Sequence, residues 1–327
     1  MKRREFMALV GSAAAWPSVA RTQQPERMRR VGVLLATSEI DRNEQSTITD
    51  FTNALKNAGW VPDKNIRIDI RWAAGDPGRL RENAKAMAAL APDVIVAKGA
   101  AVPTIAEATK TIPIVFTVLS DMLAQGYVKN FAHPDRNVTG FTSDEIALVS
   151  KRVEILKEVS PTLKRVLYIR GARPEARFLF QRLKENVTQL GVVATECAAT
   201  NEADLTEAIA AFARNPDGGL SAGFDAFNVV HREKLAELAA LYRLPAVYFA
   251  SFFVEENGGL IAYGPNQPQQ FKEAAQYVDR ILRGEKISNL PVQAPTQYDL
   301  AVNLKTAAVL GVTIPATVLA RADEVIE

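Results

Sequence analysis

Short apolar runs alternate with longer amphipathic segments along most of this chain. The first run covers residues 31–36 (VGVLLA), and in the segment after it Phe51, Leu55 and Ala58 fall at helical spacing before Gly59, which suits the end of a helix. Strands that alternate with helices in this way are typical of βαβ units, whose strands form a parallel sheet. The alternation therefore predicts an α/β fold built from doubly wound parallel sheets.

The alternation occurs twice, in two successive sets of similar units. The first set predicts strands at 31–36, 66–72, 93–98, 112–119 and 138–141, with helices at 45–58, 77–91 and 102–109. The second set predicts helices at 145–159, 174–190, 202–212 and 229–242, with strands at 165–169, 192–197, 218–223 and 246–250. Two such sets in 327 residues, 48% of them hydrophobic, predict two lobes with separate cores.

The segments left over after both sets indicate a chain that crosses between the lobes more than once. A strand at 260–263 and a helix at 269–282 follow a double glycine, and we expect both on the first lobe because repeated crossings hold two lobes in register. We therefore expect residues 29–143 plus 257–290 in lobe 1. Residues 144–256 plus 291–327 would form lobe 2, joined to lobe 1 by a multi-crossover hinge.

Residues 1–20 have the three parts of a secretory signal. The basic start KRREFM precedes an apolar stretch (ALVGSAAAW), and the end SVA offers small residues for cleavage. The apolar stretch is too short for a membrane anchor. The paired Arg3 and Arg4 resemble a twin-arginine signal, although the general secretory route stays open. We therefore expect a soluble periplasmic protein that begins near Arg21.

Residue counts and motifs exclude several kinds of chemistry. Lys and Arg total 39 against 37 Asp and Glu, which leaves no broad basic surface for nucleic acid. The single Cys197 and the two histidines, His133 and His231, form neither a disulfide nor a metal-ligand spacing. GxGxxG, P-loop, GxSxG and HExxH motifs are missing as well. We expect a binding protein with no metal, no cofactor and no catalytic residues.

Ligands of open parallel sheets bind outside the carboxyl ends of the strands, so the residues that follow each strand are the candidates. In the first lobe these residues are Thr37, Ser38, Gly99, Ala100, Ala101, Ser120 and Asp121, and in the second lobe they include Phe224 and Asp225. The expected ligand contacts are completed by Phe141, Thr142, Tyr248 and Tyr263.

Two kinds of side chain in this set have a second interpretation. Asp121 and Asp225 can each pair with a ligand ammonium or accept hydrogen bonds from its hydroxyls, but each can equally cap the next helix. The aromatic residues Phe141, Phe224 and Tyr248 can hold a ligand ring, or they can pack in a core. The sequence leaves these alternatives open.

Four stretches carry a resemblance to a known family: KRREFMALVGSAAAWP, IPIVFTVLSD, NVTGF and the C-terminal third from YGPNQPQQF onward. They closely resemble the ABC transporter substrate-binding proteins of the tryptophan/tyrosine-binding type, over nearly the whole chain. The resemblance implies a periplasmic binding protein type I fold without catalysis. It also implies a small-molecule ligand, an amino acid or an aromatic or carboxylate compound, delivered to an ABC transporter permease in the membrane. We expect a monomer.

The same resemblance points to the loops at Thr37 and Ser38, at residues 99–101, and at Ser120 and Asp121 as ligand contacts. This sequence departs from the usual pattern with KGAA at 98–101, where relatives often have a Gly- and Thr-rich loop. It also has Met122 where proline is common, and AGFD at 222–225 where many relatives have a proline-containing run. These departures leave room for a ligand other than an aromatic amino acid.

Two other functions fit the same architecture. The ligand-sensing lobes of a transcription regulator would need a helix-turn-helix, and here the residues before the first strand have the pattern of an export signal. An exported two-lobed enzyme would need a nucleophile beside a base, which the sequence does not offer. A turnover assay on the released ligand distinguishes the enzyme from the binding protein.

Overall fold

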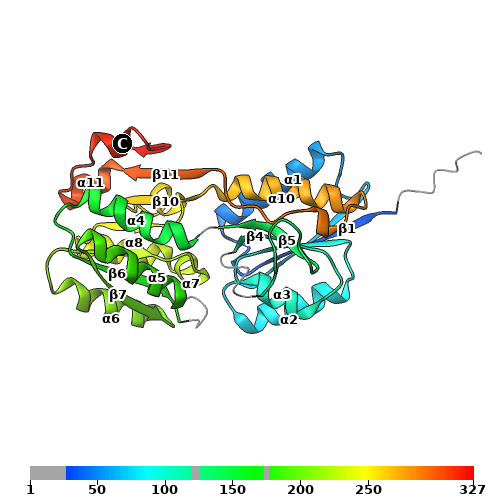
Figure 1. The fold of residues 1–327 in the computed structure, drawn as a ribbon, viewed down its shortest axis with the longest axis horizontal. Coiled ribbons are helices and arrows are strands. Elements are labelled where there is room, and N and C mark those ends of the chain that lie inside the picture. Colours follow the sequence, from blue (N-terminus) through cyan, green and yellow to red (C-terminus); the bar gives the residue numbers. More distant parts are fainter. Residues whose placement is uncertain (1–26, 120–125, 144, 173–176) are drawn as a thin grey trace, which may run out of the picture.

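Two α/β lobes lie side by side in the computed structural model, which describes residues 27–119, 126–143, 145–172 and 177–327 (Figure 1). Each lobe is built on one sheet, with helices on both faces. The expected fold class is therefore confirmed. In the described part of the chain, no helix is long and apolar enough to cross a membrane.

The first sheet has five parallel strands in the order β2-β1-β3-β4-β5. The strands are β1 (Arg29–Leu35), β2 (Ile66–Trp72), β3 (Val94–Lys98), β4 (Ile114–Leu119) and β5 (Val138–Thr142). Alternate residues of β1 face opposite ways, with Val31 and Val33 in one core and Leu34 in the other. The strands β1, β3, β4 and β5 are buried on both faces, as continuous apolar strands require, whereas the edge strand β2 is partly exposed.

Two pairs of helices cover the first sheet. On one face lie α1 (Arg42–Asn57) and α10 (Gln267–Leu282), and on the other lie α2 (Pro77–Ala89) and α3 (Ala101–Ala108) (Figure 1). The last of the first-lobe elements is the short 3-10 turn η3 (Ile287–Asn289). Asp41 caps α1, because its carboxylate accepts from the backbone N–H of Asn43 and Glu44.

The second sheet has seven strands in the order β12-β11-β10-β9-β8-β6-β7. They are β6 (Arg165–Gly171), β7 (Val193–Ala199), β8 (Gly218–Ala222), β9 (Ala246–Tyr248), β10 (Ile261–Pro265), β11 (Tyr298–Asn303) and β12 (Glu324–Ile326). The β10–β11 pair is antiparallel, whereas the other neighbours are parallel. The sheet is therefore mixed at the edge that carries the C-terminal strands.

The second sheet is also covered on both faces. One core includes α4 (Glu145–Val159), α5 (Arg177–Val187) with the turn η2 (Thr188–Leu190), α11 (Leu304–Leu310) and α12 (Ala316–Leu319). The other core includes α6 (Glu202–Ala213), α7 (Ala226–Val230), α8 (Arg232–Leu241) and α9 (Phe252–Glu255). Each lobe thus has a helix layer, a sheet and a second helix layer.

The position of β10 corrects one expectation from the sequence. We placed the strand at 260–263 on the first lobe, but β10 pairs with β9 and β11 of the second sheet. The short α9 connects β9 to β10, and strands joined by a short crossover lie next to each other in one sheet. Helix α10 does lie on the first lobe, where Phe271 packs edge-on against Phe51 with ring centroids 6.3 Å apart.

The last crossing also lies later in the chain than we expected. Gln293 forms a bridge with Phe141 of β5, and Val292 is part of a first-lobe core, so residues 291–293 belong with the first sheet. Along the described segments the chain thus passes between the lobes after β5, after β10 and before β11. Gln270 links two of these passages, because its side chain accepts from the N–H of Val118 and donates to the carbonyl of Thr142.

Candidate functional site

A cavity of about 670 Å³ lies between the lobes, where strand ends of both sheets face each other. The first lobe contributes Ala36 after β1 and Ala100 after β3. The second lobe contributes Gly171 at the end of β6, Ala199 at the end of β7 and Asp225 after β8. Ligands of open α/β folds bind here, outside the carboxyl ends of the parallel strands.

Most of the cavity wall consists of small side chains, Arg81 adds a cation, and the two carboxylates of the wall cap helices. Asp225 is buried and caps α7, because its Oδ1 accepts from the N–H of Phe227 at 2.7 Å. Backbone hydrogen bonds from Arg79 and Gly78 lower the pKa of Asp76, the cap of α2. Both carboxylates therefore have fixed positions in the wall.

The N-terminus of α3 forms another part of the wall. Gly99 has a φ of +49°, which turns the chain from β3 into the helix, and Ala100, Pro103 and Thr104 line the cavity. Among the described residues no side chain caps this helix. The start of a helix carries a partial positive charge and unpaired N–H groups, so this wall favours an anion.

Gly99 and Phe224 come together across the cleft, as expected of two loops that face each other. A Cβ at Gly99 would lie 3.6 Å from the Phe224 ring, which packs edge-on against Phe249 with centroids 5.0 Å apart. The first lobe therefore touches an aromatic pair of the second lobe here. Ala101, by contrast, is buried in the first-lobe core and only its neighbours reach the cavity.

Strand β4 ends in a strained conformation beside the cleft. Val118 has a φ of +52°, and the register to β5 shifts between Thr117 and Leu119. A β-branched residue rarely adopts this conformation, and such strain gathers at functional sites. Ser120 and Asp121, which we expected as ligand contacts, follow directly but lie outside the described residues.

Thr37 and Ser38 follow β1 at the rim of the cleft. Thr37 is buried, its carbonyl accepts from the N–H of Ala74, and its hydroxyl has no hydrogen-bond partner in the described part of the chain. The Ser38 carbonyl accepts from the N–H of Asp41. The structure thus places both residues in the turn that leads into α1.

Two aromatic candidates pack in cores instead of facing a ligand. Phe141 is 2% exposed and packs against Tyr277 with ring centroids 4.9 Å apart. Tyr248 is 1% exposed and stacks on Phe253 at 4.6 Å, and this burial raises the pKa of Tyr248. Phe141 belongs to an apolar core of the first lobe and Tyr248 to one of the second lobe. Of the two interpretations given above, packing in a core therefore describes both side chains.

Thr142 and Tyr263 lie at crossings between the lobes. The Thr142 carbonyl accepts from Gln270, and the Tyr263 carbonyl accepts from Nε of the buried Arg152 at 2.8 Å. The Tyr263 ring stacks on Tyr298 of β11 with centroids 6.0 Å apart. The structure therefore ties Thr142 to α10 beside a crossing, and it packs Tyr263 within the second lobe, between α4 and β11.

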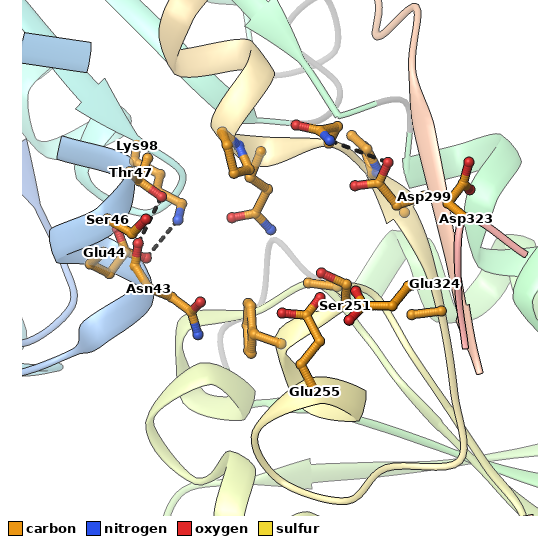
Figure 2. A pocket seen from close by; sticks show the side chains of 18 residues that line it. Asn43, Glu44, Ser46, Thr47, Lys98, Ser251, Glu255, Asp299, Asp323 and Glu324 are labelled. Carbon is orange, nitrogen blue, oxygen red and sulfur yellow. Dashed lines mark hydrogen bonds and ion pairs between the residues drawn. The ribbon is translucent and has the colours of Figure 1, made fainter. Parts of the chain in front are cut away.

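A second cavity, of about 420 Å³, lies between α1 and β3 of the first lobe and the edge of the second sheet (Figure 2). On its first-lobe side the half-buried Lys98 donates to the buried Glu44 at 2.6 Å. The opposite side carries Glu255, Asp299, Asp323 and Glu324. Sequence reasoning did not find this group, because it joins segments far apart in the chain. The only local signal was a lysine at the end of an apolar strand.

The carboxylates of the second cavity repel one another. Burial and a hydrogen bond with Glu255 raise the pKa of Glu324 to about 7. Burial also raises the pKa of Asp299, although a hydrogen bond from Asn266 opposes the shift. Nevertheless, the described residues include no group of three or more His, Cys, Asp or Glu side chains placed to hold a metal ion.

Comparisons with known proteins agree with this architecture. The sequence model of a family described as ABC transporter substrate binding protein matches residues 39–326. A curated tyrosine-binding protein from Clostridioides difficile (strain R20291) is 23% identical over 262 residues, which cover 80% of this chain and 75% of the relative.

Two solved structures are similar over 91% of this chain. One is an ABC domain in complex with L-Trp from Streptococcus pneumoniae, with a TM-score of 0.83 at 22% identity and 99% of that chain covered. The other is the ligand-free, open structure of a substrate-binding protein with adhesive properties from Clostridium difficile, with a TM-score of 0.67 at 25% identity and 99% covered.

Proposed function

The chain belongs to the ABC transporter substrate-binding protein family, and we propose that it binds a small amino acid or aromatic carboxylate between its lobes and delivers it to a membrane permease. The observation that carries the proposal is the 670 Å³ cavity at the facing strand ends. Its size falls within the roughly 300 to 1,000 Å³ of ordinary small-molecule sites. Because both lobes form the wall, closure encloses the ligand.

Charge in the wall supports a ligand that carries a carboxylate and an ammonium group. The start of α3 at Ala100 attracts the carboxylate, and the buried Asp225 on the opposite lobe attracts the ammonium. The small side chains between them leave room for the rest of the molecule. An amino acid would therefore span the cavity from one lobe to the other.

The arrangement of the lobes supports the same proposal. The structure superposes better on the relative in complex with L-Trp, with a TM-score of 0.83, than on the ligand-free, open relative, with 0.67. The two comparisons cover the same share of this chain, and we attribute the difference in TM-score to the arrangement of the lobes. We therefore assign this arrangement to the closed state.

We test the ligand by thermal unfolding in the presence of single amino acids and aromatic acids. A ligand at a hundredfold excess over Kd stabilises the native state by about 2.7 kcal/mol. A panel without any shift contradicts the proposed ligand class, provided that native mass spectrometry finds no ligand already bound. Absence of turnover of the bound molecule separates a binding protein from an enzyme.

A pair of variants tests the carboxylate position. Ala100→Asp places a negative charge at the N-cap of α3, where it suits the helix but repels a ligand carboxylate. We expect this variant to keep its melting temperature and to lose at least tenfold in affinity. Ala100→Asn is the matched control, since it adds the same volume without the charge. Equal affinity in both variants contradicts a carboxylate at α3.

Delivery to a permease requires export of the protein. We propose export because of the sequence of the N-terminal segment. The basic start, apolar stretch and small residues up to Ala20 have the pattern of a cleaved signal. We expect N-terminal sequencing of the periplasmic protein to begin near Arg21. An intact Met1 on protein recovered from that compartment contradicts cleavage. Replacing Arg3 and Arg4 with lysine distinguishes the twin-arginine route, which that change blocks, from the general route.

A further inference from the structure

We propose that Asp41 of the first lobe and Arg232 of the second form a latch that holds the two lobes closed over the ligand cavity. The inference rests on the proposed binding function, but its test also works without a ligand. Arg232 Nη1 donates to Asp41 Oδ2 at 2.7 Å, across the cleft, between residues 191 positions apart in the sequence. The pair therefore joins elements that only the lobe arrangement brings together.

Each partner is held in place by its own lobe. Asp41 Oδ1 accepts from the N–H of Asn43 and Glu44, which caps α1. Arg232 donates to the carbonyl of Val229 at 3.0 Å, and its guanidinium lies 5.8 Å from the centroid of the Phe252 ring. These contacts survive a rigid movement of the lobes. The ion pair itself does not, so it distinguishes the closed from the open state.

The pair is well shielded from water in this arrangement. The side chain of Asp41 is 7% exposed and that of Arg232 is 16% exposed. Charges at such sites attract each other more strongly than exposed pairs do, and salt screens them less. Both charges regain water when the lobes separate, which offsets part of the attraction. The net effect on the closing equilibrium is therefore moderate, and we expect about tenfold.

The location of the pair suits control of the ligand cavity. Arg232 directly follows His231, which lines the 670 Å³ cavity, and Phe252 beneath its guanidinium lines the 420 Å³ cavity. Asp41 directly precedes α1, whose first turn reaches the second cavity through Asn43 and Glu44. When the Asp41–Arg232 ion pair breaks, the lobes that form the two walls of the binding site are free to separate. Asp41 and Arg232 are therefore positioning residues, which act on the ligand through lobe closure.

Two variants remove the latch without removing the helix cap. Asp41→Asn keeps an oxygen that caps α1, since Asn and Asp are equally good at this position, but loses the charge. Arg232→Gln removes the other charge. Lys234→Gln is the matched control, because Lys234 lies on the same helix and pairs with Glu237 of that helix at 3.0 Å. Thermal melts confirm that all three variants fold.

Lobe separation is measured by pulsed electron resonance between spin labels on cysteines introduced at Glu82 of α2 and Glu207 of α6, both exposed. Burial raises the pKa of the native Cys197 to about 11, so labels react with the new cysteines. Without ligand we expect a mainly short distance in the wild type and in Lys234→Gln. Asp41→Asn and Arg232→Gln shift most molecules to a longer distance, and the double variant shifts no more than either alone.

Affinity for L-tryptophan and L-tyrosine is measured on the same proteins by calorimetry. If either binds, the latch variants bind it about two- to fivefold more weakly, because a tenfold smaller closing equilibrium lowers the closed fraction by that factor and the apparent affinity falls in proportion. Distance distributions that match the wild type in both latch variants overturn the proposal, whatever the ligand result. A shift of the distances in a protein that binds neither probe supports the latch and counts against the proposed ligands.

Discussion

Replacing Phe271 with alanine is expected to unfold the first lobe under milder conditions than the second. Phe271 lies on α10, is fully buried, and packs edge-on against Phe51 in the core of the first lobe. Removing a buried phenylalanine ring costs about 3 to 5 kcal/mol, which is a large part of the roughly 5 to 15 kcal/mol that stabilises a typical domain. At about 2 kcal/mol per molar urea, the unfolding midpoint falls by roughly 2 M.

Tryptophan fluorescence reports this transition selectively. Both tryptophans of the described residues, Trp60 and Trp72, belong to the first lobe, and Trp60 Nε1 donates to Asp279 of α10 at 2.7 Å. Release of α10 therefore changes the surroundings of Trp60 directly. Far-UV circular dichroism follows both lobes together. We expect the fluorescence midpoint of Phe271→Ala to precede the dichroism midpoint, which shows that unfolding is no longer two-state.

Phe253→Ala is the matched control in the second lobe. Phe253 is equally buried and stacks on Tyr248, so its loss costs a similar free energy. We expect it to lower the dichroism midpoint more than the fluorescence midpoint. The reasoning is refuted if Phe271→Ala lowers the fluorescence midpoint by no more than Phe253→Ala does, because α10 would then contribute nothing special to the first lobe.

Three further changes have defined outcomes. The raised pKa of Glu324 means that its proton is held more tightly in the folded state, so this carboxyl's contribution to stability is complete below pH 4.5 and is lost as the pH rises through 7. Glu324→Gln should flatten the melting temperature over that range, and an unchanged profile would contradict the repulsion with Glu255. Asp225→Ala should lose about 0.5 to 2 kcal/mol in urea unfolding through the lost cap of α7, whereas Asp225→Asn should lose almost none. Gly140→Ala should destabilise the first lobe by roughly 3 kcal/mol, because a Cβ there would lie 2.0 Å from the Phe116 carbonyl oxygen at a φ of +146°; a normal urea midpoint for this variant would show that the two strands can separate.

Local sequence patterns predict the first sheet well. The expected strand at 66–72 matches β2, and those at 93–98 and 138–141 differ from β3 and β5 by one residue at one end. Periodicity is enough here because consecutive units build neighbouring strands. Helix α1 begins at Arg42, three residues before the expected start, although Asp41 followed three residues later by Glu44 is itself a capping signal.

Long-range placement is what the patterns could not supply. Nothing in the apolar strand β10 says which of two sheets it joins, and the antiparallel partner β11 comes from a segment without βαβ spacing. Local patterns likewise predict which loops reach the cleft, but not which side chains of the candidate set face it. Gly99, Ala100, Phe224 and Asp225 do gather between the lobes, whereas Phe141 and Tyr248 sit in cores. The partner of Asp41 is 191 residues away, beyond any local signal.

The return of α10 to the first lobe determines the order in which the chain can fold. The core that contains Val31 and Phe51 is completed by Phe271, Val278 and Leu290, which leave the ribosome long after the strands they cover. Strands β6 to β10, in contrast, are contiguous in the sequence. Contacts between distant segments form late, and domains made of one continuous segment fold as units during synthesis. The part of the second lobe built from β6 to β10 is therefore expected to become compact first, before β11 and β12 complete its sheet. The first sheet meanwhile has only α1 on the face that α10, encoded more than two hundred residues downstream, later covers.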